Sequence, residues 1–362
     1  MGISTGTTLR NKRRYAGLVA DYADCDPTRI RASLTEFLHP DAVVNVVQPI
    51  NRVAGAQPFL ERVMEPLLHS LRHLHRRSDM LFGGEHHGAE WVVSHGHYMG
   101  EFVNDWMGIP ANGQPVWLHY AEYHRMEELR SVEYYLYIDM LDLLRQLGRW
   151  PLPQSVGHEG FIPGPATGDG MLLSAQDPEQ SRLSLKTVED MLAELWTEEE
   201  GWRPYWRRNM CWYGPSGYGS YFGLEGFCRF QQPYEGIFEP GRFSSAFRKS
   251  GDARLDDRVK GHYARFADGA YVASGGWPSH GGFMVRPWLG VEGKGQMFTV
   301  RLCDFWRRSG DVLVENWVLI DLVDMLLQLE FDVFRQAGIE LQLPWERRRP
   351  AFDEGGTPSF PG

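Results

Sequence analysis

The sequence predicts an α+β protein made of two tandem cone-shaped barrels, each a curved antiparallel sheet wrapped around helices. The first observation is a repeat: residues 131–147 (SVEYYLYIDMLDLLRQL) recur as residues 313–329 (LVENWVLIDLVDMLLQL). The ungapped register extends back to Tyr98 and His280 and contains roughly 15 identities in about 50 aligned positions, which indicates a repeated structural unit. The second observation is that helical periodicity precedes alternating strands in each copy, an order typical of helices on one face of an antiparallel sheet.

The 362 residues suffice for two modules that each bury a core. The expected boundaries place the first module at residues 13–149 and the second at residues 183–340. Residues 150–182 are rich in Pro and Gly and lack periodicity, so they are predicted to be a linker. This linker is longer than a simple connection needs, and we expect it to lie along a surface or to cover the mouth of a pocket. A basic tail is expected at residues 341–362.

In the first module, apolar residues recur at helical spacing over residues 13–39, with a break at Asp26 and Pro27. Asp26 can cap a second helix that begins at Pro27. Asp139 can likewise cap a short closing helix. Between these helices the pattern predicts a strand at 43–47, a third helix at 58–75, and strands at 79–85, 90–101, 116–126 and 132–138.

The second module repeats this order of elements. The predicted elements are a helix at 185–200, a strand at 208–213, a helix at 223–238, strands at 258–266, 271–277, 282–285, 297–307 and 313–320, and a closing helix at 322–337. A strongly curved sheet folded over its helices makes a cone with an apolar interior, which is a natural pocket for a small molecule.

Charge and composition exclude some kinds of binding partner and bear on where the protein is located. The net charge of -10 argues against a nucleic-acid partner, because phosphate contacts need clustered cations. The basic stretches at 11–14 and 347–349 are interpreted as solvated termini. No apolar run approaches the roughly 18 residues that a membrane span needs, and no signal peptide is recognisable. The four cysteines show no CxxC spacing, so reduced thiols in a cytoplasmic protein are expected.

Several segments of both modules follow one family pattern. They are Tyr98–Phe102, Gly108–Val116 and Leu143–Gly148 in the first module, and Trp212–Pro215, Gly223–Phe227, Ser279–Phe283, Gly290, Gly295, Val314–Trp317 and Asp321 in the second. In these segments the chain resembles the SnoaL-like polyketide cyclases of the nuclear transport factor 2-like superfamily. The resemblance implies cone-shaped barrels that pair sheet to sheet. A tandem chain could supply both halves as an internal pseudo-dimer, with Glu122 superposed on Asp304; a homodimer of whole chains is left open.

The resemblance also implies chemistry without a metal or an organic cofactor, in which a pocket carboxylate, often with a histidine, moves protons next to a carbonyl. Burial in an apolar cone raises the pKa of a carboxylate toward neutral pH. In the second module Asp304 alternates with apolar residues on one face of its strand, and His280 occupies the position of the family histidine. We interpret these two as a catalytic pair, with a structural hydrogen-bonding role as the alternative for each.

The first module offers a different pair. Glu122 matches Asp304, and His124 lies two residues further along the same strand, so both side chains point to one face. These two residues could act as acid and base by themselves. Tyr98 occupies the position of the family histidine. The first module therefore lacks one residue of the mechanism that the resemblance implies.

Aromatic side chains are expected to line the pockets. The substrate-binding candidates are Trp212, Tyr218, Trp288, Trp306 and Trp317 in the second module and Tyr120 and Trp106 in the first. Among the acids that both modules share, Asp139 and Asp321 are expected to cap the closing helices. Glu133 and Glu315 are expected to bind a neighbouring loop or the other module.

Histidines are dense in the first module. His69 and His73 have helical spacing, and His95 and His97 have strand spacing, so either pair could ligate a metal. Because no HExxH or Cys/His pattern accompanies them, no metal site is predicted.

Two classes of function fit these observations. The first is an enzyme that performs cofactor-independent acid/base chemistry (cyclisation, isomerisation, or dehydration as a lyase) on a hydrophobic small molecule bearing a carbonyl or hydroxyl group. The second is a non-catalytic protein whose cones bind a ligand or a partner. An isolated acid on an apolar strand face favours the enzyme, since such an acid costs free energy unless something compensates. An epoxide hydrolase fits less well, because it would need an Asp-Arg-Asp set that the sequence does not place.

Overall fold

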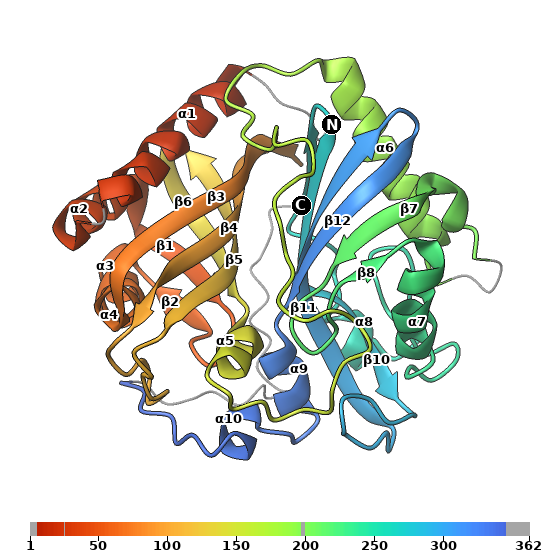
Figure 1. Ribbon diagram of the computed structural model, residues 1–362. Helices are drawn as coiled ribbons and strands as arrows, with labels where there is room; N and C mark the ends of the chain where they lie inside the picture. The colour runs from red at the N-terminus through yellow and green to blue at the C-terminus, as the bar shows by residue number, and fades with distance from the viewer. Residues whose placement is uncertain (1–5, 25, 197–199, 345–362) are drawn as a thin grey trace.

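Two six-stranded sheets face each other across the middle of the molecule (Figure 1). The computed structural model describes residues 6–24, 26–196 and 200–344. The strand orders are β2-β1-β6-β5-β4-β3 and β8-β7-β12-β11-β10-β9, so the second sheet repeats the first position by position. In each sheet the first long strand pairs in parallel with the last, and the other pairings are antiparallel. The predicted tandem α+β fold is therefore confirmed.

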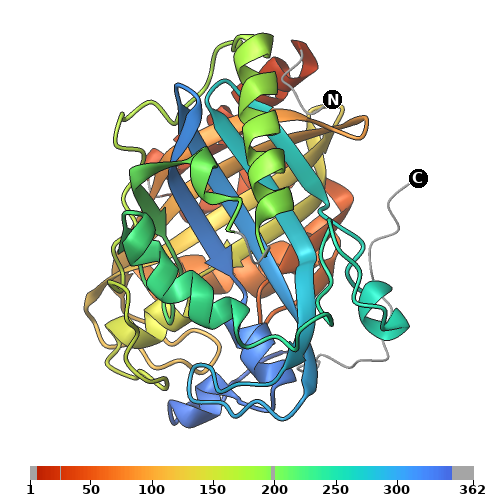
Figure 2. The ribbon, with the colours of Figure 1, turned by 90° about the vertical axis from the view of Figure 1, so that its right-hand side faces the viewer.

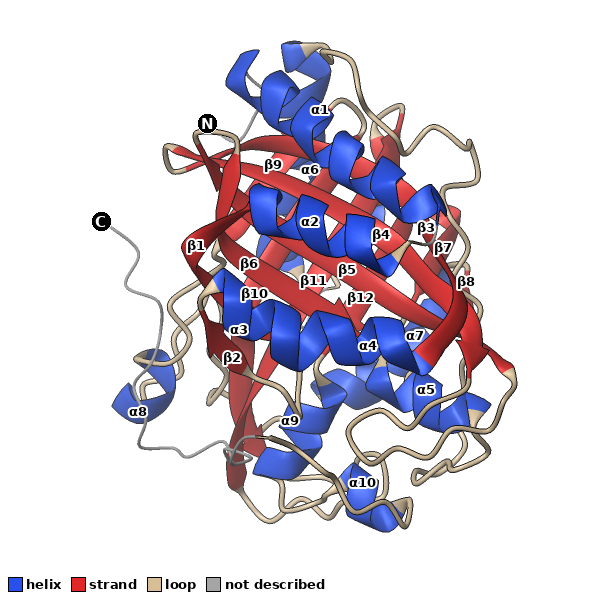
Figure 3. Ribbon diagram, turned by 90° about the vertical axis from the view of Figure 1, so that its left-hand side faces the viewer, coloured by secondary structure: helices blue, strands red, loops and turns tan. Residues whose placement is uncertain are grey.

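The first sheet consists of β1 (Leu38–Val46), β2 (Arg52–Ala54), β3 (Leu71–His86), β4 (Ala89–Phe102), β5 (Pro115–Glu127) and β6 (Arg130–Ile138). Its helices are α1 (Gly6–Asp21), α2 (Pro27–Phe37), α3 (Ala56–Phe59), α4 (Glu65–Ser70) and α5 (Met140–Gln146), with short helical turns at Tyr22–Asp24 and Leu60–Met64. Figure 3 shows α1 to α4 lying over the outer face of this sheet. As the sequence predicts, Asp26 caps α2: its carboxylate accepts from the N–H of Thr28 at 2.9 Å.

The second sheet consists of β7 (Trp206–Tyr213), β8 (Tyr221–Phe222), β9 (Ala264–Asp268), β10 (Tyr271–Met284), β11 (Gln296–Ser309) and β12 (Val312–Ile320). Its helices are α6 (Pro178–Glu194), α7 (Leu224–Glu235), α8 (Ala253–Asp256), α9 (Leu322–Gln328) and α10 (Val333–Gln336), with a short turn at Arg203–Tyr205. Figure 2 shows α6 and α7 crossing the outer face of the sheet. Each sheet therefore has an outer face under helices and an inner face toward the other module.

Aromatic residues join the two inner faces. The ring of Tyr135 stacks on that of Tyr263, with centroids 3.7 Å apart and planes 3° from parallel. The hydroxyl of Tyr123 donates to the backbone oxygens of Ser274 and Asp304, each at 3.0 Å. The expected internal pseudo-dimer is therefore built by sheet-to-sheet contact.

The closing helices add a reciprocal contact between the modules. Asp139 caps α5, and its second carboxylate oxygen accepts from the N–H of Ser216 in the other module at 2.8 Å. Asp321 caps α9, and its second oxygen accepts from the N–H of Gln48 at 3.0 Å. Burial and a neighbouring aspartate raise the pKa of Asp139 to about 8 and that of Asp321 to about 7. The predicted capping role of both acids is confirmed, and each acid also holds the other module.

The linker follows the edge of this interface, at the front of Figure 1. Met171 forms a parallel bridge with Leu81 of β3. The oxygen of Pro163 accepts from the indole N–H of Trp317 at 2.7 Å. The carboxylate of Glu315 accepts from the N–H of Ala166 at 3.1 Å, which agrees with its expected contact to a neighbouring loop. The linker thus lies along a surface and touches both modules.

Several predicted element boundaries are wrong: the helix predicted at 185–200 is α6 at Pro178–Glu194, and the strands predicted at 271–277 and 282–285 form the single strand β10. The third helix ends at Ser70, and residues 71–75 already belong to β3, where Leu71 pairs with Phe102. The strand predicted at 258–266 is confined to the five residues of β9, and the closing helix of the second module breaks between α9 and α10. At the end of the third helix, pairing with β4 overrides a helical apolar pattern, since tertiary contacts outweigh local propensity.

The N-terminal basic stretch is also different from the prediction. Residues from Gly6 onward form α1, and Lys12 is fully buried in an ion pair with Asp268 of the second module, with 2.6 Å between Nζ and Oδ2. Its Nζ also donates to the oxygen of Ser174 at 2.9 Å. Lys12 is thus part of the contact between modules, whereas the second basic stretch, 347–349, lies outside the described residues.

Cleaving the linker tests the internal pseudo-dimer. A protease site introduced at Val156, which is 72% exposed, should be cut without separating the two halves. The stacked sheets and the caps of α5 and α9 hold the modules together independently of the linker. Size-exclusion chromatography of the cut protein should give one peak at the elution volume of the uncut chain. Two separate half-size peaks under native conditions would contradict the pseudo-dimer.

Candidate functional site

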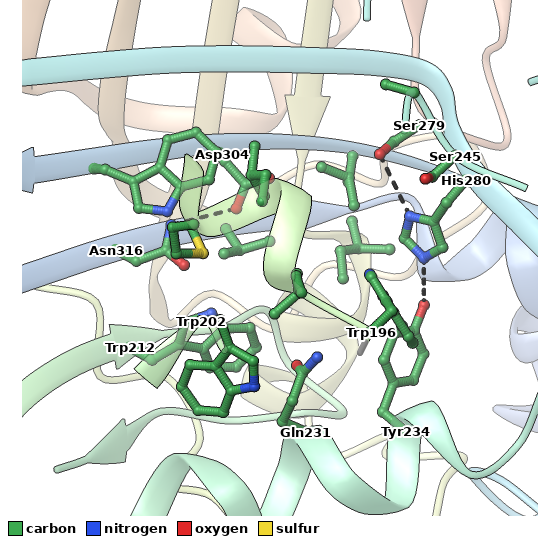
Figure 4. A pocket seen from close by; sticks show the side chains of 18 of the residues that line it. Trp196, Trp202, Trp212, Gln231, Tyr234, Ser245, Ser279, His280, Asp304 and Asn316 are labelled. Atoms are coloured by element: carbon green, nitrogen blue, oxygen red, sulfur yellow. Dashed lines mark hydrogen bonds between the residues drawn. The ribbon is translucent and has the colours of Figure 1, made fainter. Parts of the chain in front are cut away.

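The second cone encloses a cavity of about 120 Å³ between its helices and its sheet (Figure 4). Five tryptophans contribute to its lining: Trp196, Trp202, Trp206, Trp212 and Trp306. The polar side chains among the lining residues are Gln231, Tyr234, Ser245, His262, Ser279, His280, Asp304 and Asn316. Among the described residues that line this cavity, Asp304 is the one carboxylate.

Asp304 points into the cavity from β11. The preceding and following residues, Cys303 and Phe305, are buried toward the first module, so strand alternation directs Asp304 to the cone. Asn316 of β12 donates from Nδ2 to Oδ1 of Asp304 at 3.3 Å. Burial outweighs this hydrogen bond and the charge of Arg265, and it raises the pKa of Asp304 to about 7. Asp304 can therefore both accept and release a proton near neutral pH.

A row of side chains crosses the sheet beside this acid. Ser274 of β10 pairs with Asp304 on one side and with Arg265 of β9 on the other. Nε of Arg265 donates to Oγ of Ser274 at 3.3 Å. Arg265 also contacts Nδ1 of His262, and Oγ of Ser274 lies 2.6 Å from that same nitrogen. Because a guanidinium can only donate, Nδ1 of His262 must be the acceptor and Nε2 carries the proton.

Hydrogen bonds continue from His262 along the cavity wall. Nε2 of His262 donates to Oγ of Ser279 at 3.1 Å, and Nδ1 of His280 lies 3.3 Å from that oxygen. Nε2 of His280 lies 2.8 Å from the hydroxyl of Tyr234 on α7. Burial lowers the pKa of His280 to about 3, and burial together with Arg265 lowers that of His262. Both histidines are therefore neutral at pH 7.

Asp304 and His280, which the sequence suggests as a catalytic pair, line the same cavity but are not hydrogen-bonded to each other. His280 pairs across the sheet with Val300, four residues from Asp304 along β11. Four residues of strand span roughly 13 Å, and Figure 4 shows the two side chains on opposite sides of the cavity. The register shift between Gly276 and His280 shortens this separation by two residues, since the unshifted register would pair His280 with Phe298, but it does not close the gap. A proton could pass between them only by way of a bound molecule.

The first cone places its acid in a different environment. Glu122 is 2% exposed, and its Oε2 lies 2.7 Å from Nη2 of Arg76. The hydroxyls of Tyr98 and Tyr134 donate to Oε1 at 2.6 and 2.9 Å, and that of Tyr15 donates to Oε2. Burial alone would raise the pKa of Glu122, but Arg76 and these hydrogen bonds hold it well below its usual range. Both oxygens of Glu122 are therefore engaged by protein groups.

The environment of Arg76 explains why this acid is enclosed. Its guanidinium lies over the rings of Tyr120, Tyr22, Tyr15 and Tyr98, with 4.7 to 5.6 Å between Cζ and the ring centroids. Nε2 of His124 lies 3.6 Å from Oε2 of Glu122, as expected for two side chains on the same face of one strand. His124 is itself buried, and its Nδ1 lies 3.0 Å from Oγ of Ser131. Side chains occupy the space around this pair.

The lengths of two equivalent strands account for the difference. β3 has 16 residues, and its first half carries Arg76 into the cone. β9 has 5 residues, and the segment before it instead supplies Ser245, Phe247 and His262 to the lining of the second cavity. The contact between Arg76 and Glu122 could not be predicted from the sequence, because the residues before Arg76 have the apolar pattern of a helix. The roles of Arg265 and His262 could not be predicted either, because their partners lie on other strands.

Some of the predicted aromatic contacts need correction. Trp212 and Trp306 line the cavity. The other candidates lie outside the lining: Tyr218, Trp288, Trp317, Tyr120 and Trp106. Trp317 alternates with Asn316 and so faces the linker and the first module. Tyr120 belongs to the filled first cone, where its hydroxyl accepts from Nε of Arg76 at 3.0 Å.

The remaining predicted residues have structural partners. Glu133 accepts from Arg125 at 3.0 Å and from the hydroxyl of Tyr135 at 2.6 Å. Nε2 of His95 lies 2.6 Å from Nε2 of His119 in the interior. Across the described ranges, no group of three or more His, Cys, Asp or Glu side chains is arranged to hold a metal ion. His69 lies in the last turn of α4 and His73 lies in β3, so this pair does not share a helix.

Replacing Glu122 by Gln should destabilise the protein. The variant leaves Arg76 buried without its counter-charge, which costs about 3–5 kcal/mol when one partner of a buried pair is removed. Because the pKa of Glu122 is lowered by folding, this loss should be full at pH 7 and should shrink below about pH 4. Chemical unfolding as a function of pH measures it. The double variant Glu122→Gln/Arg76→Met should regain part of the loss, and a single variant as stable as the native chain at pH 7 would refute the structural role.

Replacing Asp304 by Asn should have the opposite effect. Folding raises the pKa of Asp304, so the native chain loses stability as pH rises from about 4 to about 7, by at most about 1.4 kcal/mol per pH unit. The variant lacks this loss, and its thermal midpoint should exceed that of the native chain at pH 8 and match it at pH 4. The same substitution at the exposed Asp311 is the control. Equal midpoints at pH 8 would mean that Asp304 is not held in a costly environment.

Comparisons with known proteins agree with this architecture. Residues 18–147 match the SnoaL-like polyketide cyclase family model. The search of curated proteins finds no match. Among solved structures, AclR from Streptomyces galilaeus is 23% identical over 41% of this chain and 89% of its own, with a TM-score of 0.34. IdmH from Streptomyces antibioticus is 19% identical over 38% and 98%, with a TM-score of 0.32. Residues 18–147, which make up most of the first module, thus match the SnoaL-like polyketide cyclase family, and the second module repeats the same strand order.

Proposed function

We propose that the second cone is the active site of a cofactor-independent acid/base enzyme, of cyclase, isomerase or lyase type, for a hydrophobic small molecule with a carbonyl or hydroxyl group. The observation that carries this proposal is Asp304: an isolated carboxylate, titrating near pH 7, at the wall of a tryptophan-lined cavity. A general base works best when its pKa lies near the working pH. Proteins that share one fold carry out several reactions, and the three reaction types proposed here have in common the removal of a proton by an acid/base group.

In the proposed reaction, the carboxylate of Asp304 removes a proton from the carbon next to a carbonyl. The electron pair moves onto the carbonyl oxygen. The resulting enolate then closes a ring by attacking a second carbonyl carbon, takes back a proton at another carbon, or expels a hydroxyl group. In these three cases Asp304 returns its proton to the new alkoxide, to the carbon, or to the departing hydroxyl, which leaves as water. Asn316 holds the carboxylate in position. The hydroxyls of Ser279 and Tyr234, fixed by neutral His262 and His280, lie on the opposite wall and are suited to hold a second oxygen of the substrate, away from the reacting carbonyl.

The first cone is assigned a supporting role in this proposal. Glu122 is fully engaged with Arg76 and three tyrosines, whereas Asp304 has one side-chain hydrogen bond. The first sheet also anchors the strands of the site, because Tyr123 binds the backbone oxygens of Ser274 and Asp304. An epoxide hydrolase is disfavoured, since among the described lining residues no second carboxylate accompanies Asp304.

A non-catalytic ligand-binding protein is the alternative. It is favoured by one observation: across the described residues, no hydrogen bond joins Asp304 to a histidine of the same cavity. In that case the cavity would bind ring compounds without moving a proton.

Exchange of carbon-bound hydrogen tests the proposal without knowledge of the natural substrate. The small ketone 2-tetralone, incubated with the protein in deuterated buffer, should exchange its α-hydrogens faster than in buffer alone, as followed by NMR. Asp304→Asn should reduce this acceleration by about 100- to 10,000-fold, the usual contribution of a general base. The acceleration should rise with pH through about 7.

Asp311→Asn, the same change on an exposed turn of the same hairpin, should exchange at the native rate. Binding of 2-tetralone without faster exchange would favour the binding protein. Full activity of Asp304→Asn would exclude Asp304 as the base.

A further inference from the structure

A second cavity, of about 500 Å³, adjoins the cone. His262 and Ala246 line both cavities, so the two hollows meet at these residues. We call the second cavity the basic vestibule, because its lining includes Arg182, Lys186, Lys260 and Arg265. Among its described lining residues, Glu189 is the one acid. This local excess of positive charge stands out in a chain whose net charge is -10.

Two of these four cations are already neutralised. Nζ of Lys186 lies 2.6 Å from Asp190, and Arg182 pairs with Glu179. Lys260 is exposed, and within the described part of the chain it has no ion pair. Arg265 and Lys260 are therefore the cations available to a bound molecule.

Arg265 is the more informative of the two because it is buried. Its exposed fraction is 8%, and its side-chain contacts are Ser274, His262 and the ring of Phe247. Within the described ranges no carboxylate lies at ion-pair distance from it. A buried arginine without a carboxylate in contact is costly, and burial lowers the pKa of Arg265 to about 10 although the more distant Glu189 and Asp304 act to raise it. A bound anion would supply the missing charge and could form paired hydrogen bonds with the guanidinium.

The position of Arg265 relates this charge to the proposed base. Arg265 and Asp304 flank Ser274 in one row of the sheet, so β9 and β11 are two strand spacings, or roughly 10 Å, apart. Phe247 lies over Arg265 and also lines the cone. A molecule whose ring fills the cone can therefore extend a polar group past Phe247 toward the guanidinium.

Resting on the function proposed above, we infer that the substrate is an organic anion: its apolar ring lies in the tryptophan-lined cone, and its carboxylate or phosphate group is bound by Arg265 and Lys260 in the basic vestibule. The charged group fixes which carbon of the ring system faces Asp304. The cone supplies affinity for the apolar part, and the vestibule supplies selectivity for the charged end.

Matched naphthalene compounds test this inference by binding alone. The probes are 2-naphthoate and 2-naphthyl phosphate, which carry an anionic group, and 2-naphthamide, a neutral analogue of 2-naphthoate. Quenching of the cavity tryptophans, checked by calorimetry, gives each dissociation constant. We expect at least one anion to bind 10-fold or more tightly than the amide, and the tighter anion identifies the group as carboxylate or phosphate.

Variants locate the source of the selectivity. Arg265→Gln and Lys260→Gln should each reduce the preference for the anion by about 5-fold or more while leaving 2-naphthamide binding unchanged. Lys260 is exposed, so its variant remains informative if Arg265→Gln fails to fold. Lys294→Gln, an exposed lysine of the same module outside both cavities, is the matched control. Equal binding of the amide and the anions to the native chain would overturn the inference. An unchanged preference for the anion in both Lys260→Gln and a folded Arg265→Gln would overturn it as well.

The outcome is separate from that of the proposed function. Preference for the anion depends on Arg265 and Lys260, whereas hydrogen exchange depends on Asp304. A protein that prefers the anion but does not accelerate exchange would be a binding protein for organic acids. One that accelerates exchange without any preference would retain the proposed function and lose this inference.

Discussion

The contact between the two inner sheet faces is the constraint on which the rest of the structure depends. Once Tyr135 stacks on Tyr263, every second residue of the central strands is committed to the interface, and the alternate residues must enter the cones. Phe305 faces the first module, so Asp304 has to face the second cone. Tyr123 then ties the backbone of the site-bearing strands to the first module. The first module thus fixes the geometry of the tryptophan-lined cavity, to which none of its described residues contributes a lining side chain.

Much of this could be predicted from the sequence, because the repeat and the strand alternation are local patterns. The positions of Asp304, Trp212 and Trp306 on one face follow from a period of two residues. Arg265 and His262 could not be found this way, since they meet Asp304 only through the pairing of β9 with β10. Likewise, the distance between Asp304 and His280 depends on a register shift in β10 that composition and alternation do not reveal.

The filled first cone shows a further limit of sequence reasoning. A motif comparison aligns Glu122 with Asp304 and so suggests similar roles for both. Their surroundings differ because a long β3 brings Arg76 to Glu122, whereas the short β9 leaves the equivalent space open. The apolar residues around position 71 read as the end of a helix, and only pairing with β4 identifies them as strand. The start of β3, which decides which cone is open, is therefore the part of that strand whose first residues the sequence pattern assigns to a helix.

The two acids also show how distance to a cation sets their chemistry. Arg76 touches Glu122 directly, and this contact outweighs burial and keeps the carboxylate ionised. In the second cone, Arg265 lies two strands from Asp304, as Arg76 does from Glu122, but its guanidinium is engaged by Ser274 and His262 and does not contact the acid. Burial therefore prevails, and the pKa of Asp304 rises to about 7. The same contacts leave Arg265 without an ion-pair partner among the described residues, so that it is available to a ligand. One structural arrangement therefore accounts both for an acid that can exchange a proton at neutral pH and for a cation that can orient an anionic substrate beside it.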